Sequence, residues 1–140
     1  MGQRFGARAI DVIGFIGLII AITVLLSVLK HLLRVDVGNI FFSLMGWVLL
    51  LGFPVYEVLM TALTGATVGK RLVGIRVVDQ STARNLSFGA AFVRQVIPFA
   101  GFLVLVFGGV IVYLSPIFDN SRRMQGWHDK AAGDLVIVAR

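Results

Sequence analysis

The residues best placed to do chemistry in this sequence are acidic side chains inside, or at the edge of, apolar segments. Asp11 follows Arg8 by three positions at the start of the first apolar run, and Glu57 lies within the second. An ionisable group in a membrane segment is costly and normally marks a functional site. A carboxylate there can hold a proton or a monovalent cation, so Asp11 and Glu57 are candidate ion or proton sites.

Both acidic residues also have a structural interpretation. Residues three apart share a helix face, so Arg8 and Asp11 can form an ion pair that anchors the helix end. Alternatively, Asp11 faces the interior of a helix bundle and joins a polar site. Glu57 can instead accept a structural hydrogen bond from Arg94, Arg8 or a hydroxyl group. The residue types and their spacing leave these alternatives open.

A third group of charges follows the last apolar run. Its tryptophan suits the headgroup level of a membrane, and its cations suit lipid phosphates. Asp129 does not help to bind anionic lipid, and Arg8 and Arg76 are its expected partners. The charged and aromatic members of this group are Asp119, Arg122, Arg123, Trp127, His128, Asp129 and Lys130.

Motifs for enzymatic or metal chemistry fail on residue type and spacing. The stretch GATVGKR has its glycines one residue too close for a phosphate-binding loop, and Arg71 replaces the required hydroxyl residue. There is no cysteine, and His31 and His128 are expected on opposite sides of the membrane, which excludes a zinc site. No Ser or Thr is paired with a His and an acid in a nucleophile pattern. The sequence predicts no enzyme, cofactor or metal.

Composition indicates a membrane protein. The 140 residues are 58% hydrophobic and 14% charged, with a mean hydropathy of +0.93, whereas a soluble domain has about 25% charged residues. The net charge of +6 then reflects cytoplasmic loops that face anionic lipid headgroups, and nucleic acid is not an expected partner. We expect one membrane domain over residues 1–140.

Three apolar runs are long enough to cross a bilayer, which takes about 20 residues. The third is interrupted by Pro98, Gly101 and a glycine pair at positions 108 and 109. Such residues weaken a continuous helix. The three runs are residues 10–29, 40–63 and 96–118.

Two further segments predict strands. In residues 72–79 the apolar side chains alternate with Gly74 and Arg76, which is the period of a strand. Residues 134–139 form a second short β run, introduced by Gly133. Isolated strands leave backbone groups unpaired, so we expect the two segments to share one small sheet.

This pairing constrains the topology. The N-terminus, the loop between the second and third runs, and the tail carry most of the Lys and Arg residues, which places all three in the cytoplasm. Three simple crossings would leave the tail outside. We therefore expect residues 87–97 to enter the membrane part-way as a re-entrant helix, residues 98–101 to turn and residues 103–118 to return. A single plain crossing by residues 96–118 is the alternative.

The predicted fold is thus mainly α: a multi-pass transmembrane helix bundle of three spans with a small cytoplasmic β-sheet and both termini in the cytoplasm. Three motifs in order over nearly the whole chain resemble the RDD family of small multi-pass membrane proteins, named for one arginine and two aspartates. The first motif is RxxD, with Arg8 and Asp11. The second is GATVGKRLVGIRVVD followed by LSFGAAFVRQ. The third, GWHDKAAGDLVIV, places the second aspartate at Asp129; Asp134 departs from relatives, which often have threonine there.

The resemblance implies two possible roles in the cell (inner) membrane. Monovalent cation/proton antiport has been proposed for a family member, in which case Asp11, Glu57 and Asp129 would bind the ion or proton. So few helices, without an inverted repeat, would need a homo-oligomer to enclose a path. Eukaryotic relatives are instead linked to membrane-protein complexes as accessory factors. In that role Arg8, Asp11 and Asp129 would hold the sheet against the helix ends, and the sheet would bind a partner membrane protein.

Overall fold

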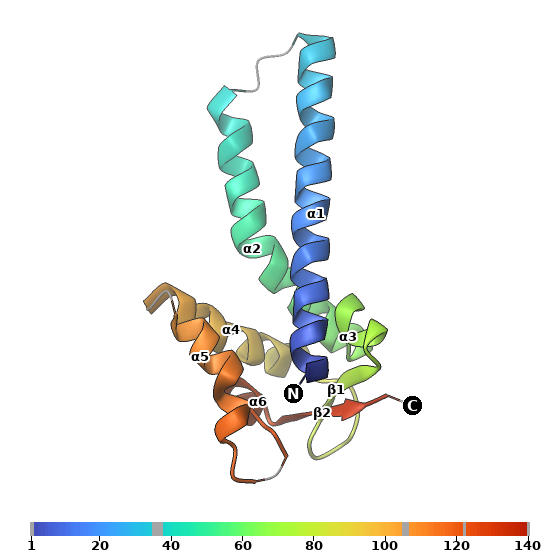
Figure 1. Cartoon of the computed structure of the whole chain (residues 1–140), viewed down its shortest axis with the longest axis vertical. Helices are drawn as coiled ribbons and strands as arrows, with labels where there is room; N and C mark the ends of the chain where they lie inside the picture. Colours follow the sequence, from blue (N-terminus) through green and yellow to red (C-terminus); the bar gives the residue numbers. More distant parts are fainter. Residues whose placement is uncertain (1, 35–37, 105–106, 122, 140) are drawn as a thin grey trace.

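The computed structural model describes residues 2–34, 38–104, 107–121 and 123–139, so Arg122 of the predicted charge group lies outside the described residues. Two long helices rise from a base of shorter helices and one small sheet (Figure 1). The mainly helical architecture and the small sheet predicted from the sequence are confirmed.

The long helices are α1 (Gly2–Leu33) and α2 (Gly38–Thr64). Gly2–Leu33 and, within α2, Ser43–Thr64 are long and apolar enough to cross a membrane. They cover the predicted spans at residues 10–29 and 40–63. Large apolar side chains on them are exposed, such as Ile20 at 58% and Leu25 at 59%. Such surfaces are favourable in lipid, where apolar side chains avoid water.

The two long helices meet near the base and lie apart above it (Figure 1). At the meeting point the rings of Phe15 and Phe53 are 5.3 Å apart. Gly52 makes room for this contact, because a Cβ there would lie 3.2 Å from the Phe15 ring. The main packing partner of α1 is the short helix α3 (Val68–Leu72). One copy of the chain therefore leaves the apolar faces of α1 and α2 open.

The third apolar run folds as a helical hairpin. The helices α4 (Phe88–Val104) and α5 (Gly108–Leu114) pack together, and the 3-10 helix η1 (Ser115–Phe118) follows. A plain crossing by residues 96–118 is therefore wrong, and both helices are shorter than a membrane-spanning helix. The predicted turn at residues 98–101 is also wrong, because α4 continues to Val104 with Pro98 buried inside it. The third span is therefore unconfirmed.

Glycines let the two arms of this hairpin approach each other. A Cβ at Gly101 would lie 2.9 Å from the backbone of Gly108 and Gly109. The breaker residues thus serve close helix packing instead of the turn itself, which is a common use of glycine between apolar helices.

The predicted sheet is present. Strand β1 (Ile75–Asp79) pairs antiparallel with β2 (Asp134–Val138), with Val77 opposite Val136. The first strand starts later than predicted, because Thr67 caps α3 and makes residues 68–72 helical. Gly74 then reverses the chain with a φ of 71°, a conformation that favours glycine.

A small core fixes the sheet to the helices. Val77 packs with Ala62 of α2, with Leu86 of the loop before α4 and with Ala91 of α4. A two-stranded sheet is marginal in isolation and needs such packing. The last helix, α6 (Trp127–Ala132), packs on α4 and leads into β2 through Gly133, whose φ is 66°.

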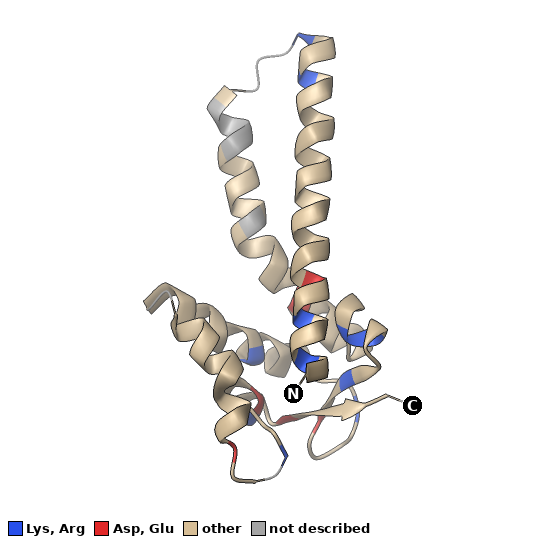
Figure 2. Ribbon diagram, in the orientation of Figure 1, with Lys and Arg blue, Asp and Glu red and all other residues tan. Residues whose placement is uncertain are grey.

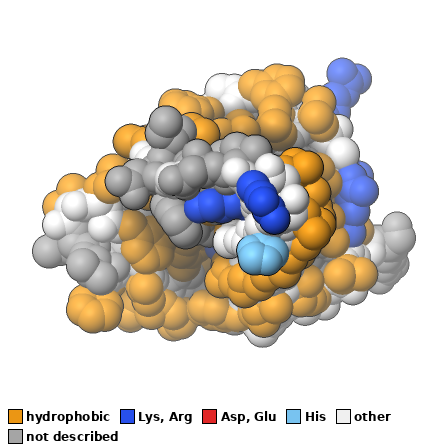
Figure 3. Space-filling model, turned by 90° about the horizontal axis from the view of Figure 1, so that it is seen from above, with side chains coloured by type: hydrophobic (Ala, Val, Ile, Leu, Met, Phe, Trp, Pro, Cys, Tyr) orange, Lys and Arg blue, Asp and Glu red, His pale blue; other side chains and the backbone are white. Residues whose placement is uncertain are grey.

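The charges gather at the base. In Figure 2 the coloured positions cluster around the lower end of α1 and the sheet, whereas the middle of α1 carries none. The far end of α1 carries Lys30 and His31 in its last turn, and Figure 3 shows blue and pale-blue side chains at this end amid a largely hydrophobic surface. Both chain ends lie at the base (Figure 1), and the pairing of β1 with β2 places the C-terminal strand there.

Candidate functional site

Arg8 does not form an ion pair with Asp11, which was one of the two alternatives that the sequence left open. Its guanidinium pairs with Glu57 of α2, whose side chain is 5% exposed, and lies over the ring of Tyr113 at 4.1 Å. The spacing of three residues allowed contact within α1 but did not require it. Glu57 supplies the partner of Arg8 where α1 crosses the base of α2. Among the structural partners considered for Glu57, which were Arg94, Arg8 and a hydroxyl group, Arg8 is the one observed.

Asp11 faces α3 and acts as a cap supplied by another helix. Its carboxylate accepts hydrogen bonds from Thr67 Oγ1 at 2.5 Å, from the Gly69 backbone N–H at 2.7 Å and from Tyr56 at 3.2 Å. The free N–H groups at a helix start favour an anion there. Of the two alternatives for Asp11, the inward-facing polar site is therefore correct.

Gly69 explains how α1 and α3 can approach so closely. A Cβ at this position would lie 2.9 Å from the Asp11 carboxyl and would overlap the Ala7 carbonyl oxygen. The glycine of the GK pair therefore serves helix docking. Its neighbour Lys70 then projects toward Glu57.

Lys70 approaches Glu57 without a hydrogen bond. Its Nζ lies 3.8 Å from Glu57 Oε1, and its side chain is 14% exposed. Burial lowers the pKa of Lys70 to about 8, although Glu57 opposes this shift. Lys70 was not singled out from the sequence as a site residue. The only signal was its place in the GKR stretch, which also fits an ordinary solvated loop.

Asp129, the second aspartate of the last motif, is fully buried at the start of α6. It forms an ion pair with Arg94 at 2.5 Å, and it accepts hydrogen bonds from Arg4 at 2.7 Å and from the Gly126 backbone N–H at 2.8 Å. Burial opposes ionisation of this carboxyl, yet Arg94, His128 and Arg4 hold its pKa well below the usual range. The charge-assisted contacts outweigh desolvation here.

The partners predicted for Asp129 were wrong. Arg8 pairs with Glu57, and Arg76 on β1 donates to Asn85 at 2.7 Å. Arg4 and Arg94 take their place because α1 and α4 both reach the start of α6. Only the docking of these helices decides this choice among several arginines.

Asp134 is a buried residue whose role the sequence did not reveal. Its carboxylate pairs with Arg94, which it shares with Asp129. Burial and the neighbouring Asp129 raise the pKa of Asp134 to about 6, although Arg94 opposes them. The only available signal was an aspartate at the first position of an otherwise apolar strand.

The rest of the last charge group closes a loop. Asp119 accepts from the Gln125 backbone N–H at 2.9 Å and pairs with Lys130 at 2.8 Å. His128 lies beside Asp129 at 3.1 Å, and burial lowers the pKa of its ring. Trp127 is exposed at 55%, whereas His128 is turned inward.

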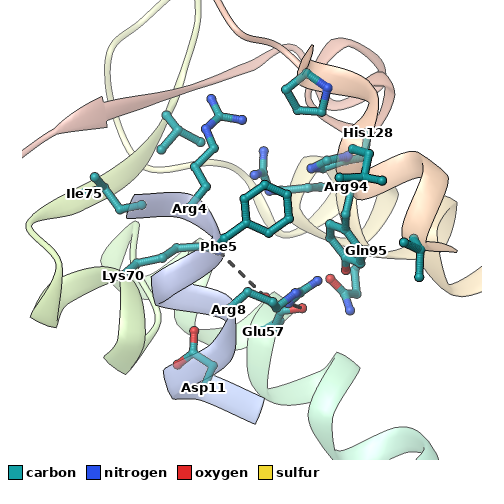
Figure 4. A pocket seen from close by; sticks show the side chains of 15 residues that line it. Arg4, Phe5, Arg8, Asp11, Glu57, Lys70, Ile75, Arg94, Gln95 and His128 are labelled. Atoms are coloured by element: carbon teal, nitrogen blue, oxygen red, sulfur yellow. Dashed lines mark ion pairs between the residues drawn. The ribbon is translucent and has the colours of Figure 1, made fainter. Parts of the chain in front are cut away.

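These elements surround a cavity of about 250 Å³. Its charged lining consists of Arg4, Arg8, Asp11, Glu57, Lys70 and Arg94. Figure 4 shows these side chains arranged around Phe5, with His128 at one side. Asp11 and Glu57 thus reach one cavity, whereas Asp129 lies behind Arg4 and Arg94. Among the described residues, no three His, Asp or Glu side chains group to hold a metal ion.

Fold and site together define a mainly helical protein with membrane-length apolar helices, whose base is held together by buried charges. The RDD family model matches residues 1–133. The chain therefore belongs to the RDD family, as its motifs indicated, and this membership together with the apolar helices indicates a membrane protein. The match ends one residue before Asp134. No curated protein and no solved structure was found to match the chain.

Proposed function

We propose that this protein is a non-enzymatic accessory protein of the cell membrane, anchored by α1 and α2. On the cytoplasmic side, its base and sheet would bind a partner membrane protein. The observation that supports this role is the internal pairing of the buried carboxylates. Each already has a cation or several hydrogen-bond donors as protein partners. They are Asp11, Glu57, Asp129 and Asp134.

The pairs join segments that are far apart in the sequence. Arg8–Glu57 connects α1 to α2, Asp11–Thr67 connects α1 to the start of α3, and Arg4–Asp129 connects α1 to α6. Removing one member of such a buried pair costs about 3–5 kcal/mol, because a charge is left without a partner. This network suits a rigid base better than it suits the exchange of ions.

The outer surface of the base offers a place for a partner. Leu72 at the end of α3 is 70% exposed, and Ile137 and Val138 on β2 are 41% and 62% exposed. Val138 lies opposite Ile75 in the sheet, next to the turn that follows α3. Successive strand residues point to opposite faces of a sheet, and Val136, which shares a face with Val138, packs against the core. We propose that Ile137, on the other face, is the centre of the contact surface for the partner membrane protein.

Photo-crosslinking tests this proposal. A photoreactive phenylalanine derivative at position 137 should capture one protein of constant mass in native membranes, identifiable by mass spectrometry. The same group at exposed position 84 is the matched control and should capture none. Equal and diffuse labelling from both positions would contradict the proposed contact surface.

Cation/proton antiport by an oligomer is the second candidate, and the Lys70–Glu57 contact favours it. Lys70, with its pKa of about 8, loses its proton close to neutral pH. Loss of that proton would leave one Glu57 oxygen for a monovalent cation, so that one proton is released for each cation bound. Arg4, Arg8 and Arg94 around the same cavity oppose this step by like-charge repulsion.

Proton flux in proteoliposomes separates the two candidates. Correctly inserted protein, with a pH dye inside the vesicles, is pulsed with Na⁺, K⁺ or Li⁺. The accessory role predicts a flat trace for the native chain and for Glu57→Gln and Asp11→Asn. A cation-driven pH change that Glu57→Gln abolishes and Arg84→Gln preserves would establish antiport instead.

A further inference from the structure

The cavity at the base carries an excess of positive charge on its walls. Its lining includes four cations, namely Arg4, Arg8, Lys70 and Arg94, but only the two carboxylates of Asp11 and Glu57. The Asp11 oxygens are already occupied by Thr67, Gly69 and Tyr56. Arg4 and Arg94 are paired with Asp129 and Asp134 behind the lining. Glu57 is therefore the acidic side chain that Arg8 and Lys70 share.

Hydrogen-bond donors in the cavity outnumber acceptors. Lys70 has three N–H donors, yet Glu57 Oε1 at 3.8 Å lies beyond hydrogen-bond distance, and the side chain of Lys70 donates no hydrogen bond to any described residue. Arg8 pairs with Glu57 through Nη1, and a guanidinium carries five N–H donors. A bound anion would accept charge-assisted hydrogen bonds from the Lys70 ammonium and from the other N–H groups of Arg8, and hydrogen bonds of this kind are strong.

Apolar side chains also line the cavity. They include Phe5 of α1, Val110 and Leu114 of α5, and Val136 of β2. The cavity therefore offers both cations and apolar surface, beside the first turns of a membrane-length helix (Figure 4). A phosphate group attached to a short apolar or glycerol moiety matches this combination. Arg and Lys side chains are the usual protein ligands of phosphate.

We propose that this cavity binds a phosphate group, with Lys70 and Arg8 as its main ligands. The phosphate is that of an anionic lipid headgroup or a free phosphate ion. A bound anion beside Lys70 would also raise the pKa of this lysine from its present value of about 8 toward its ordinary range. This proposal is independent of the accessory role, whereas a bound phosphate that keeps Lys70 protonated would oppose the antiport step.

Binding is measured with the purified full chain in a detergent without charge. Short-chain phosphatidic acid with two eight-carbon chains is titrated, and the fluorescence of Trp47 and Trp127 is followed. Short-chain phosphatidylcholine controls for apolar binding. Inorganic phosphate is tested alone and as a competitor. We expect saturable binding of phosphatidic acid and weaker binding of phosphatidylcholine.

Lys70→Gln should weaken phosphatidic acid binding at least about tenfold, the loss expected for one charge-assisted hydrogen bond. Arg71→Gln is the matched control, because Arg71 is the exposed neighbour on the same helix, and its binding should equal that of the native chain. Lys70→Arg should retain most of the affinity. Thermal melting of each variant verifies that it is folded.

The outcomes separate the two phosphate sources. Binding of phosphatidic acid without competition by inorganic phosphate assigns the site to a lipid headgroup, and saturable binding of inorganic phosphate alone assigns it to the free ion. Three results would overturn the proposal: no saturable binding of either probe, equal binding of phosphatidylcholine, or equal affinity of Lys70→Gln and Arg71→Gln.

Discussion

At the scale of single residues, Arg94 places two aspartates in unequal environments. Asp129 also accepts hydrogen bonds from Arg4 and from a backbone N–H, so it is ionised at any physiological pH. Asp134 shares the same guanidinium, but burial and the neighbouring charge of Asp129 raise its pKa to about 6. The protein is therefore adapted to an ionised Asp129, whereas an ionised Asp134 costs free energy.

Asp134→Asn should stabilise the protein at pH 7.5, whereas Asp129→Asn should destabilise it. A rise of about two pKa units corresponds to about 3 kcal/mol against the ionised form. Because the folded pKa of Asp134 is raised, its favourable contribution is present below pH 4 and is lost as the pH rises through 6. The advantage of Asp134→Asn should thus shrink between pH 6 and 4.

Thermal melting in detergent at pH 4.5, 6 and 7.5 measures this effect. Asp79→Asn is the control, since Asp79 lies opposite Asp134 at the end of the sheet but binds its own turn through Ser81 and Thr82. A lower melting temperature of Asp134→Asn than of the native chain at pH 7.5 would contradict the prediction.

At the scale of elements, the docking of α1 on α3 organises the site. Asp11 caps α3, Gly69 allows the close approach, and Lys70 is thereby directed into the cavity. The family motifs GK and RxxD are therefore the two sides of one helix contact. Both motifs therefore have a structural role, because the contact between α1 and α3 determines where Lys70 lies in the cavity.

Gly69→Ala should lower the free energy of unfolding by about 1–3 kcal/mol, the usual cost of overpacking. The new Cβ would collide with the Ala7 carbonyl and the Asp11 carboxyl, and α3 would have to move. Gly46→Ala is the control, since nothing lies within 4 Å of a Cβ there. Denaturant unfolding of both variants measures the difference, and equal stability would show that α1 and α3 dock differently.

At the scale of the whole molecule, the base and the open end of the long helices have different characters. The sheet and the buried charges lie at the base, and both chain ends lie there too (Figure 2). The opposite end carries the last turn of α1 with Lys30 and His31. If α1 and α2 both cross the membrane, these two ends face opposite compartments.

Single cysteines can test this arrangement, because the native chain has none. Gln3→Cys and Ser81→Cys lie at the base and should react with a membrane-impermeant thiol reagent only from the cytoplasmic side. Arg34→Cys, beyond the end of α1, should react only from the outside. All three positions are exposed in the structure. Labelling of Gln3→Cys and Arg34→Cys from the same side would contradict two crossings.

Composition, hydrophobic runs and motifs by themselves determined the membrane class, the family, two long helices and the pairing of β1 with β2. These features depend on local apolar length and on period-two patterning, which the sequence displays directly. The sequence placed the turn of the hairpin at residues 98–101 because proline usually ends a helix. In the structure Pro98 is buried within α4, and the helix continues to Val104.

The partners of the charged residues were decided only by the tertiary structure. Arg8 could contact Asp11 by spacing, yet it pairs with Glu57, and Asp129 pairs with Arg4 and Arg94. The chain has 13 Lys and Arg against 7 Asp and Glu, so many pairings are locally acceptable. Burial makes one set favourable, because a carboxylate away from water requires whichever donors the docked helices bring to it.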